Sequence, residues 1–133
     1  MRKHSKLAIV TLAIAVLLGT NVFAATDYFD DTLPAKQGDT EVSTVGRAND
    51  RDVYKYFTIK ITSLGSGYTS VRAWTEDSWG ANLSDPYNEV DLNNSENINY
   101  SVIPYKGDNV KLNLDNPVYS TSTVSVSGNW TPN

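Results

Sequence analysis

The sequence of 133 residues contains no cysteine, one histidine and one methionine. The histidine is His4 and the methionine is Met1, so both lie at the start of the chain. The lack of cysteine excludes thiol nucleophiles, disulfides and cysteine-ligated zinc sites. A chain that has lost its first residues also has no histidine for acid–base catalysis. Stability then has to come from an ordinary hydrophobic core, which about 110 residues can supply.

The N-terminal segment has the features of a secretory signal in their usual order. Three basic residues within residues 2–6 precede an uncharged, mostly apolar run of twelve residues, Leu7–Leu18. Val22 and Ala24 are small residues at the two positions that signal peptidase reads, which places the cleavage before Ala25. The run is shorter than the ~20 residues of a membrane-spanning helix. We therefore expect residues 1–24 to be a signal peptide and residues 25–133 to be a single secreted β domain.

Removal of the signal makes the chain more acidic. Residues 1–24 hold three basic and no acidic residues, so eight of the 11 basic and all 15 acidic residues remain, a formal net charge of −7. This charge is opposite in sign to a phosphate-binding surface, which argues against nucleic acid as a partner. Adsorption to an anionic membrane needs clustered lysine and arginine, and we expect no membrane anchoring after signal cleavage.

Alternation of apolar and polar residues predicts strands through most of the remaining chain. Val53–Ser63 places Val53, Phe57, Ile59 and Ile61 on one face, and Tyr68–Thr75 alternates in the same way. The turn-like residues Leu64–Gly67 between these two segments predict a hairpin.

A second hairpin is predicted from Ile98–Pro104 and Val110–Asp115, which flank the turn-like residues Lys106–Asn109. Three further strands are predicted over Tyr28–Leu33, Glu41–Ala48 and Thr121–Trp130. No segment keeps a helical period for three turns. We therefore predict an all-β fold, a single antiparallel β-sandwich of about seven short strands after the cleaved N-terminal signal helix.

The longest stretch without a clean pattern is Trp74–Asp91. Long loops on a rigid β scaffold often carry function. Trp74, Trp79 and Tyr87 lie in or beside this stretch, and exposed aromatic faces stack on sugars or pack at protein interfaces. These three residues are the predicted binding site. The bland alternative is that Trp74 faces the core and Trp79 pins the loop.

Two kinds of carboxylate chemistry were also considered. Carboxylates cluster at residues 27–31, 50–52 and 85–91, and calcium binds carboxylate and amide oxygens. Residues 91–96 lack the glycine and spacing of a calcium loop, however, and Asp and Asn also suit turns. Whether the chain binds a metal is therefore left open. Acid–base catalysis needs two carboxylates across a cleft, which a chain of this size rarely builds beside a core. We expect no enzyme activity and no cofactor.

Two short elements resemble a family of short secreted Gram-positive bacterial proteins of unknown function. They are Gly46-Arg47-Ala48 before Val53-Tyr54, and Asn109–Leu112 followed by Val126–Trp130. Small secreted bacteriocin-like proteins of the lactococcin type share these elements loosely. The resemblance implies a small exported β-domain and assigns no catalytic residue. The acidic charge departs from the cationic bacteriocins that adhere to anionic envelopes.

The sequence as a whole predicts a secreted, monomeric, non-catalytic binding module with an extracellular or cell-envelope ligand. Two other hypotheses stay open. One is a secreted bacteriocin-like antimicrobial or signalling polypeptide, and the other is a calcium-dependent structural module.

Overall fold

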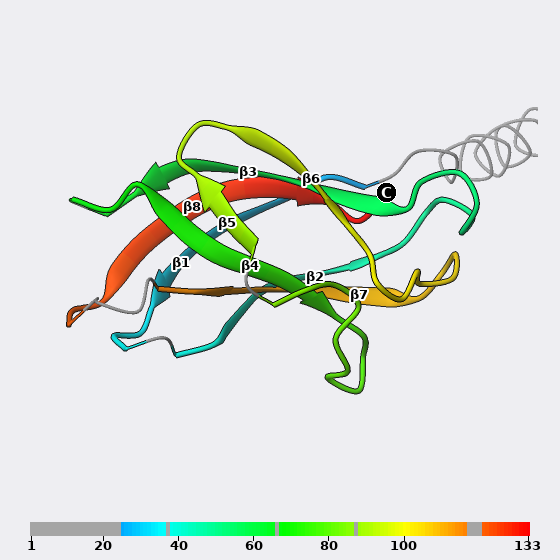
Figure 1. The fold of residues 1–133 in the computed structure, drawn as a ribbon, viewed down its shortest axis with the longest axis horizontal. Coiled ribbons are helices and arrows are strands. Elements are labelled where there is room, and N and C mark those ends of the chain that lie inside the picture. The colour runs from blue at the N-terminus through cyan, green and yellow to red at the C-terminus, as the bar shows by residue number, and fades with distance from the viewer. Residues whose placement is uncertain (1–24, 37, 66, 87, 117–120) are drawn as a thin grey trace, which may run out of the picture.

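The computed structural model describes residues 25–36, 38–65, 67–86, 88–116 and 121–133, which form two four-stranded β-sheets. The predicted signal, residues 1–24, lies outside the described residues. Within the described ranges the chain forms no α-helix, and nothing helical there has the length and apolarity to cross a membrane. The predicted all-β sandwich is confirmed (Figure 1), with eight strands rather than about seven.

The strands are β1 (Asp27–Leu33), β2 (Thr40–Gly46), β3 (Tyr56–Leu64), β4 (Ser70–Glu76), β5 (Asn88–Asp91), β6 (Ser95–Asn99), β7 (Asn109–Asp115) and β8 (Val124–Thr131). Sheet A has the order β1-β8-β3-β6, and sheet B has the order β2-β7-β4-β5. All paired strands are antiparallel. Because β1 pairs with β8, β2 with β7, β3 with β6 and β4 with β5, the connectivity is that of a jelly roll.

Both predicted hairpins are wrong. The strands β3 and β4 follow each other in the chain but belong to different sheets, and so do β6 and β7. Every connection passes from one sheet to the other except β4–β5. That single within-sheet connection lies in Trp74–Asp91, the stretch that shows no clean strand pattern. A period of two indicates which face of a strand is buried, but it carries no information about which sheet the strand joins.

The buried faces of the strands follow the predicted alternation. Phe57, Ile59 and Ile61 of β3 are fully buried, and the rings of Phe57 and Trp130 pack in a T-shaped arrangement with their centroids 6.3 Å apart. Val53 is an exception, because it precedes β3 and is 59% exposed. Trp130 is the last buried residue of β8. It is 1% exposed and belongs to the core between the sheets.

Several connections between strands gather at one end of the sandwich, here called the C-terminal end. Figure 1 shows the C-terminus there, beside the β2–β3 and β6–β7 connections, and the β4–β5 loop projects near the same end. This follows from the antiparallel order, because alternate connections of a jelly roll emerge at the same end. Residues 77–83 and 102–109, which are far apart in sequence, thereby become neighbours.

Candidate functional site

Of the three predicted site residues, Trp74 and Trp79 do not form one surface. Trp74 lies on β4 and is only 4% exposed, with its indole Nε1 donating to Glu76 Oε1 at 3.0 Å. Trp79 is 93% exposed in the β4–β5 loop. Tyr87 lies outside the described residues. The prediction that Trp74 offers an exposed aromatic face is therefore corrected, whereas Trp79 is open to a ligand.

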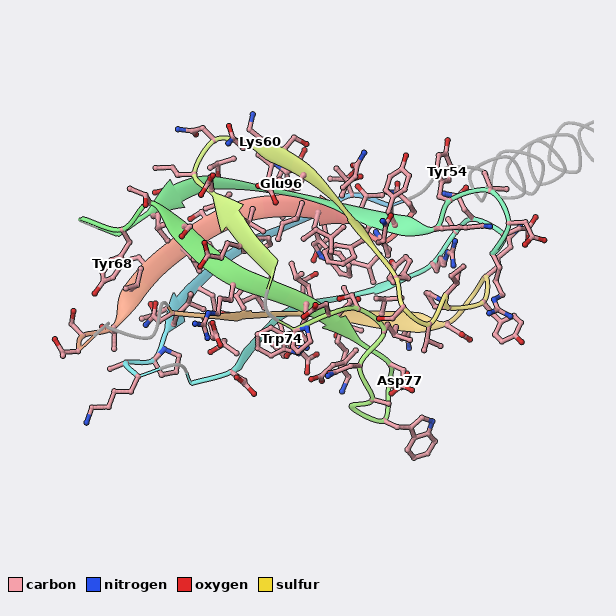
Figure 2. The ribbon with its side chains drawn as sticks, viewed as in Figure 1. Tyr54, Lys60, Tyr68, Trp74, Asp77 and Glu96 are labelled. Carbon is pink, nitrogen blue, oxygen red and sulfur yellow. The ribbon has the colours of Figure 1, made fainter. Side chains whose placement is uncertain are left out.

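Asp77 gives the Trp79 loop a defined backbone. Its Oδ1 accepts hydrogen bonds from the backbone N–H groups of Trp79 at 2.8 Å and of Ala81 at 2.9 Å. The Asp77 N–H donates to the carbonyl of Ala81 at 2.9 Å, and Gly80 N–H donates to the carbonyl of Asp77 at 3.1 Å. Gly80 adopts a φ of +83°, which favours glycine. Figure 2 shows Asp77 in the loop that projects from the sandwich, so the turn presents Trp79 away from the core.

The second wall of the site comes from the β6–β7 connection. The carbonyl of Leu83 accepts the N–H groups of Ser101 at 2.8 Å and Val102 at 3.1 Å, which joins this connection to the β4–β5 loop. Further along, Asp108 Oδ2 accepts the N–H of Tyr105 at 2.9 Å, and Asp108 N–H donates to the carbonyl of Tyr105 at 3.1 Å. Both walls therefore have hydrogen-bonded turns rather than unsupported chain.

Between the two walls lies a pocket of about 250 Å³. It is lined by Asp77, Ser78, Trp79, Leu83, Val102, Ile103, Pro104, Tyr105, Asp108 and Asn109. The lining combines apolar side chains with a few polar ones, which is the usual composition of a small-molecule site. Tyr105 is 62% exposed at this pocket, and the guanidinium carbon of Arg51 lies 4.4 Å from the centre of its ring. This contact orients the phenol ring by a cation–π interaction.

Tyr105 and Val102 were not predicted as site residues: Val102 was assigned to the predicted strand Ile98–Pro104, and Tyr105 lies between that strand and the predicted turn Lys106–Asn109. The turn signal Lys106–Asn109 was correct in itself, because Gly107 has a φ of +89°. An aromatic residue directly before such a turn was the signal that could have found Tyr105. Its proximity to Trp79 could not be predicted, because it depends on β4 and β7 being neighbours in sheet B.

A buried arginine holds the loops behind the pocket. The Arg47 side chain is 2% exposed and donates to four backbone carbonyls. They are those of Pro104 and Tyr54, Asp50 at 3.3 Å, and Asn133 at 2.5 Å. Burial lowers the pKa of Arg47 from its ordinary value. The β2–β3 connection, the β6–β7 connection and the C-terminus are therefore joined by one side chain.

Tyr100 completes this network. Its ring centre lies 5.5 Å from the guanidinium carbon of Arg47, and its hydroxyl donates to the carbonyl of Pro132 at 2.5 Å. Burial raises the pKa of the Tyr100 hydroxyl, and the charge of Arg47 opposes that rise. Pro104, which accepts from Arg47, is itself a lining residue of the pocket. The pocket wall next to Tyr105 is thus anchored to the interior.

The carboxylate clusters considered for calcium are dispersed. Across the ranges that the structure describes, no three His, Cys, Asp or Glu side chains come together as a metal site. Asp27 accepts a hydrogen bond from Ser43, and Asp30 accepts one from Ser127 at 2.9 Å. These contacts join strands to one another. The calcium-dependent module stays a hypothesis.

Comparison with known proteins adds no assignment at this point. A scan against models of protein families gives no match, and a search of curated proteins gives none either. The resemblance to short secreted Gram-positive proteins therefore stays a prediction. The pocket at the C-terminal end is the feature on which a functional argument can be based.

Proposed function

We propose that this chain is an exported, non-catalytic binding module that contacts an extracellular or cell-envelope ligand through the pocket at the C-terminal end. The observation that carries the proposal is the 93% exposure of Trp79 at a pocket whose two walls are held by hydrogen bonds. An indole on a flexible tail would lose conformational freedom on binding. An indole on a fixed turn loses less of it, so more of the contact energy appears as affinity.

The exposure of Trp79 is unusual for its residue type. Tryptophan is highly buried on average, and Trp74 and Trp130 of this chain follow that rule at 4% and 1% exposure. Trp79 adds no core contact that would explain its place in the loop. Large exposed aromatics on fixed loops are typical of residues that dominate binding energy.

The chemistry of the pocket supports binding rather than catalysis. Its two carboxylates, Asp77 and Asp108, each accept a backbone N–H in their own turn. Asp115 is the carboxyl group whose pKa is raised to about 6, and it lies six residues along β7 from Asn109. At the rise of a β-strand this is ~20 Å from the pocket. The perturbed acid and the pocket are therefore separate.

The proposal is tested with the secreted chain and whole cells or purified envelope from Gram-positive bacteria. We expect Trp79→Ala to weaken binding at least about tenfold, since a loss of ~1.4 kcal/mol is a factor of ten. The matched control is Tyr28→Ala, because Tyr28 is an aromatic residue with 76% exposure on β1 and is outside the pocket lining. Equal binding by both variants and the parent chain, or a loss only for Tyr28→Ala, would overturn the proposal.

A further inference from the structure

The pocket has a one-sided charge. Its lining includes the carboxylates Asp77 and Asp108 and no lysine or arginine. Arg51 lies beside the lining, over the outer aromatic ring of Tyr105. A ligand with phosphate, sulfate or carboxylate groups would meet two like charges there. A ligand with a positive charge would meet two opposite ones.

Each pocket carboxylate uses one oxygen for its turn. Asp77 accepts both of its loop N–H groups through Oδ1, and Asp108 accepts the N–H of Tyr105 through Oδ2. Among the hydrogen bonds of the described residues, Asp77 Oδ2 and Asp108 Oδ1 take no part. These two oxygens are thus available as acceptors for a donor on a ligand, while the turns fix the positions of both side chains.

The exposed rings add a requirement for shape. A pyranose ring has an apolar C–H face that packs on an indole or phenol, and Trp79 and Tyr105 both belong to the lining. A cation beside an aromatic face gains a further attraction. The volume of about 250 Å³ is below the ~300–1,000 Å³ of pockets for drug-sized ligands, which suits one ring at a time.

On the basis of the proposed binding function, we propose that the pocket binds a saccharide with a free amino group, a hexosamine unit that is not N-acetylated. The apolar face of the sugar ring packs on Trp79. Its ammonium and hydroxyl groups donate to Asp77 and Asp108. The net charge of −7 on residues 25–133 attracts such a cationic glycan from a distance and disfavours anionic ones.

The test compares β-1,4-linked glucosamine oligomers with N-acetylglucosamine oligomers of the same length. Tryptophan fluorescence is a suitable readout, because Trp74 and Trp130 are buried and Trp79 is the exposed indole. We expect the free amine to bind at least about tenfold more tightly at low salt. We also expect this preference to shrink in 0.5 M salt. The Debye length is then between roughly 3 and 10 Å, so the attraction between exposed charges is screened.

The charge requirement is isolated with Asp77→Asn and Asp108→Asn. Asparagine keeps a side-chain oxygen that can accept the same backbone N–H, so the turns are retained while one charge is removed. We expect each variant to weaken binding of the amine oligomer several-fold and to weaken binding of the acetylated oligomer less, because only the ammonium group loses an opposite charge. Glu96→Gln is the control, because Glu96 lies on β6, across the molecule from Asp77 (Figure 2).

Three outcomes overturn the inference. They are equal affinity for both oligomers, no binding of the amine oligomer, and an equal effect of Glu96→Gln and the two pocket variants. Each of them leaves the proposed function standing if Trp79→Ala still weakens envelope binding. If Trp79→Ala has no effect on envelope binding, the proposed function fails by itself. The two failures are therefore distinguishable.

Discussion

Arg47 and Trp79 lie at the same end of the sandwich and differ in almost every respect. The charged residue is 2% exposed, whereas the large aromatic is 93% exposed. Arg47 donates to four carbonyls from three parts of the chain, and Trp79 makes its described hydrogen bond through its backbone alone. Arginine is usually exposed and tryptophan is usually buried, so both residues reverse the general preference of their type.

The two reversals have different physical causes. A buried guanidinium is tolerated where its donors are satisfied, so Arg47 stabilises the loops around it. The exposed indole of Trp79 gains no burial within the described chain, so packing in the core does not account for its position. Removal of Arg47 should therefore affect folding, and removal of Trp79 should affect binding.

The largest expected effect is that of Arg47→Ala. The change leaves the buried carbonyl of Pro104 and the partly buried carbonyl of Tyr54 without their donor and removes the cation–π contact with Tyr100. We expect the free energy of unfolding to fall by about 3–5 kcal/mol. Urea denaturation of purified protein measures this loss. Arg47→Lys keeps the charge but not the planar fork, so its stability should lie between that of the parent and that of Arg47→Ala. A loss below about 1 kcal/mol for Arg47→Ala would contradict the structural role of Arg47.

The second-largest effect is expected for Asp115, a buried carboxyl group with fewer hydrogen-bond partners than Arg47. Asp115 is 4% exposed, and its Oδ1 has no hydrogen-bond partner within the described residues. Burial raises the pKa of Asp115 to about 6; Asp39 nearby adds to this rise, and Arg72 opposes it. The folded state therefore favours the protonated acid.

The direction of the pH dependence follows from this shift. The stabilising contribution of Asp115 is complete below its unfolded pKa near 4 and is lost as the pH rises through about 6. We expect a loss of up to about 2–3 kcal/mol between pH 4 and 7 from this group. Asp115→Asn imitates the protonated acid, so it should match the parent at pH 4 and exceed its stability at pH 7. Parallel pH–stability curves for the two proteins would refute the assignment.

A smaller effect is expected for Asp77→Ala. The change removes the acceptor for the N–H groups of Trp79 and Ala81 but touches no core residue. We expect a loss of about 1 kcal/mol in the free energy of unfolding, together with weaker envelope binding because Trp79 is no longer held. Hydrogen exchange of the amides at residues 79 and 81 reports the loosened turn. Asp77→Asn should leave both amides protected, because the asparagine oxygen can accept the same hydrogen bonds. Faster exchange of these amides in Asp77→Asn would show that the loop is held by the charge of Asp77 and not by its role as a hydrogen-bond acceptor.

The smallest effect on folding is expected for Trp79→Ala, within about 0.5 kcal/mol of the parent. Its thermal unfolding should coincide with that of the parent while its binding is lost. A destabilisation above about 1 kcal/mol would show that Trp79 packs in the folded chain, and it would remove the contrast with Arg47. Tyr28→Ala is the matched exposed-aromatic control for this measurement.

The sequence predicted the strands more reliably than their partners. Phe57, Ile59 and Ile61 were assigned to one buried face, and the structure confirms this. The alternation over Val110–Asp115 held for the inner positions, but Asn113 and Asp115 on the outer face of β7 are also buried. Burial on an outer face depends on what lies over it, which a single strand pattern does not contain.

The site was predictable only in part, and three aromatic residues show why. Trp79 was identified from its place in a long unpatterned stretch, and its loop is indeed exposed. Trp74 belonged to the same prediction, but it pairs in register with Asn113 and is covered. Tyr105 was not identified, because its connection to the pocket requires two loops that are separated by about twenty residues in sequence to meet in space.

Taken alone, the amino-acid sequence determined the all-β class, the positions of most strands and the inward face of those that alternate cleanly. These properties are local, because the alternation of side chains along an extended backbone is visible within one segment. The tertiary structure alone decided that consecutive strands enter opposite sheets, that Arg47 is enclosed by carbonyls, and that Trp79 and Tyr105 share a pocket. These properties depend on pairing between distant segments, and that pairing is determined by the packing of both sheets together.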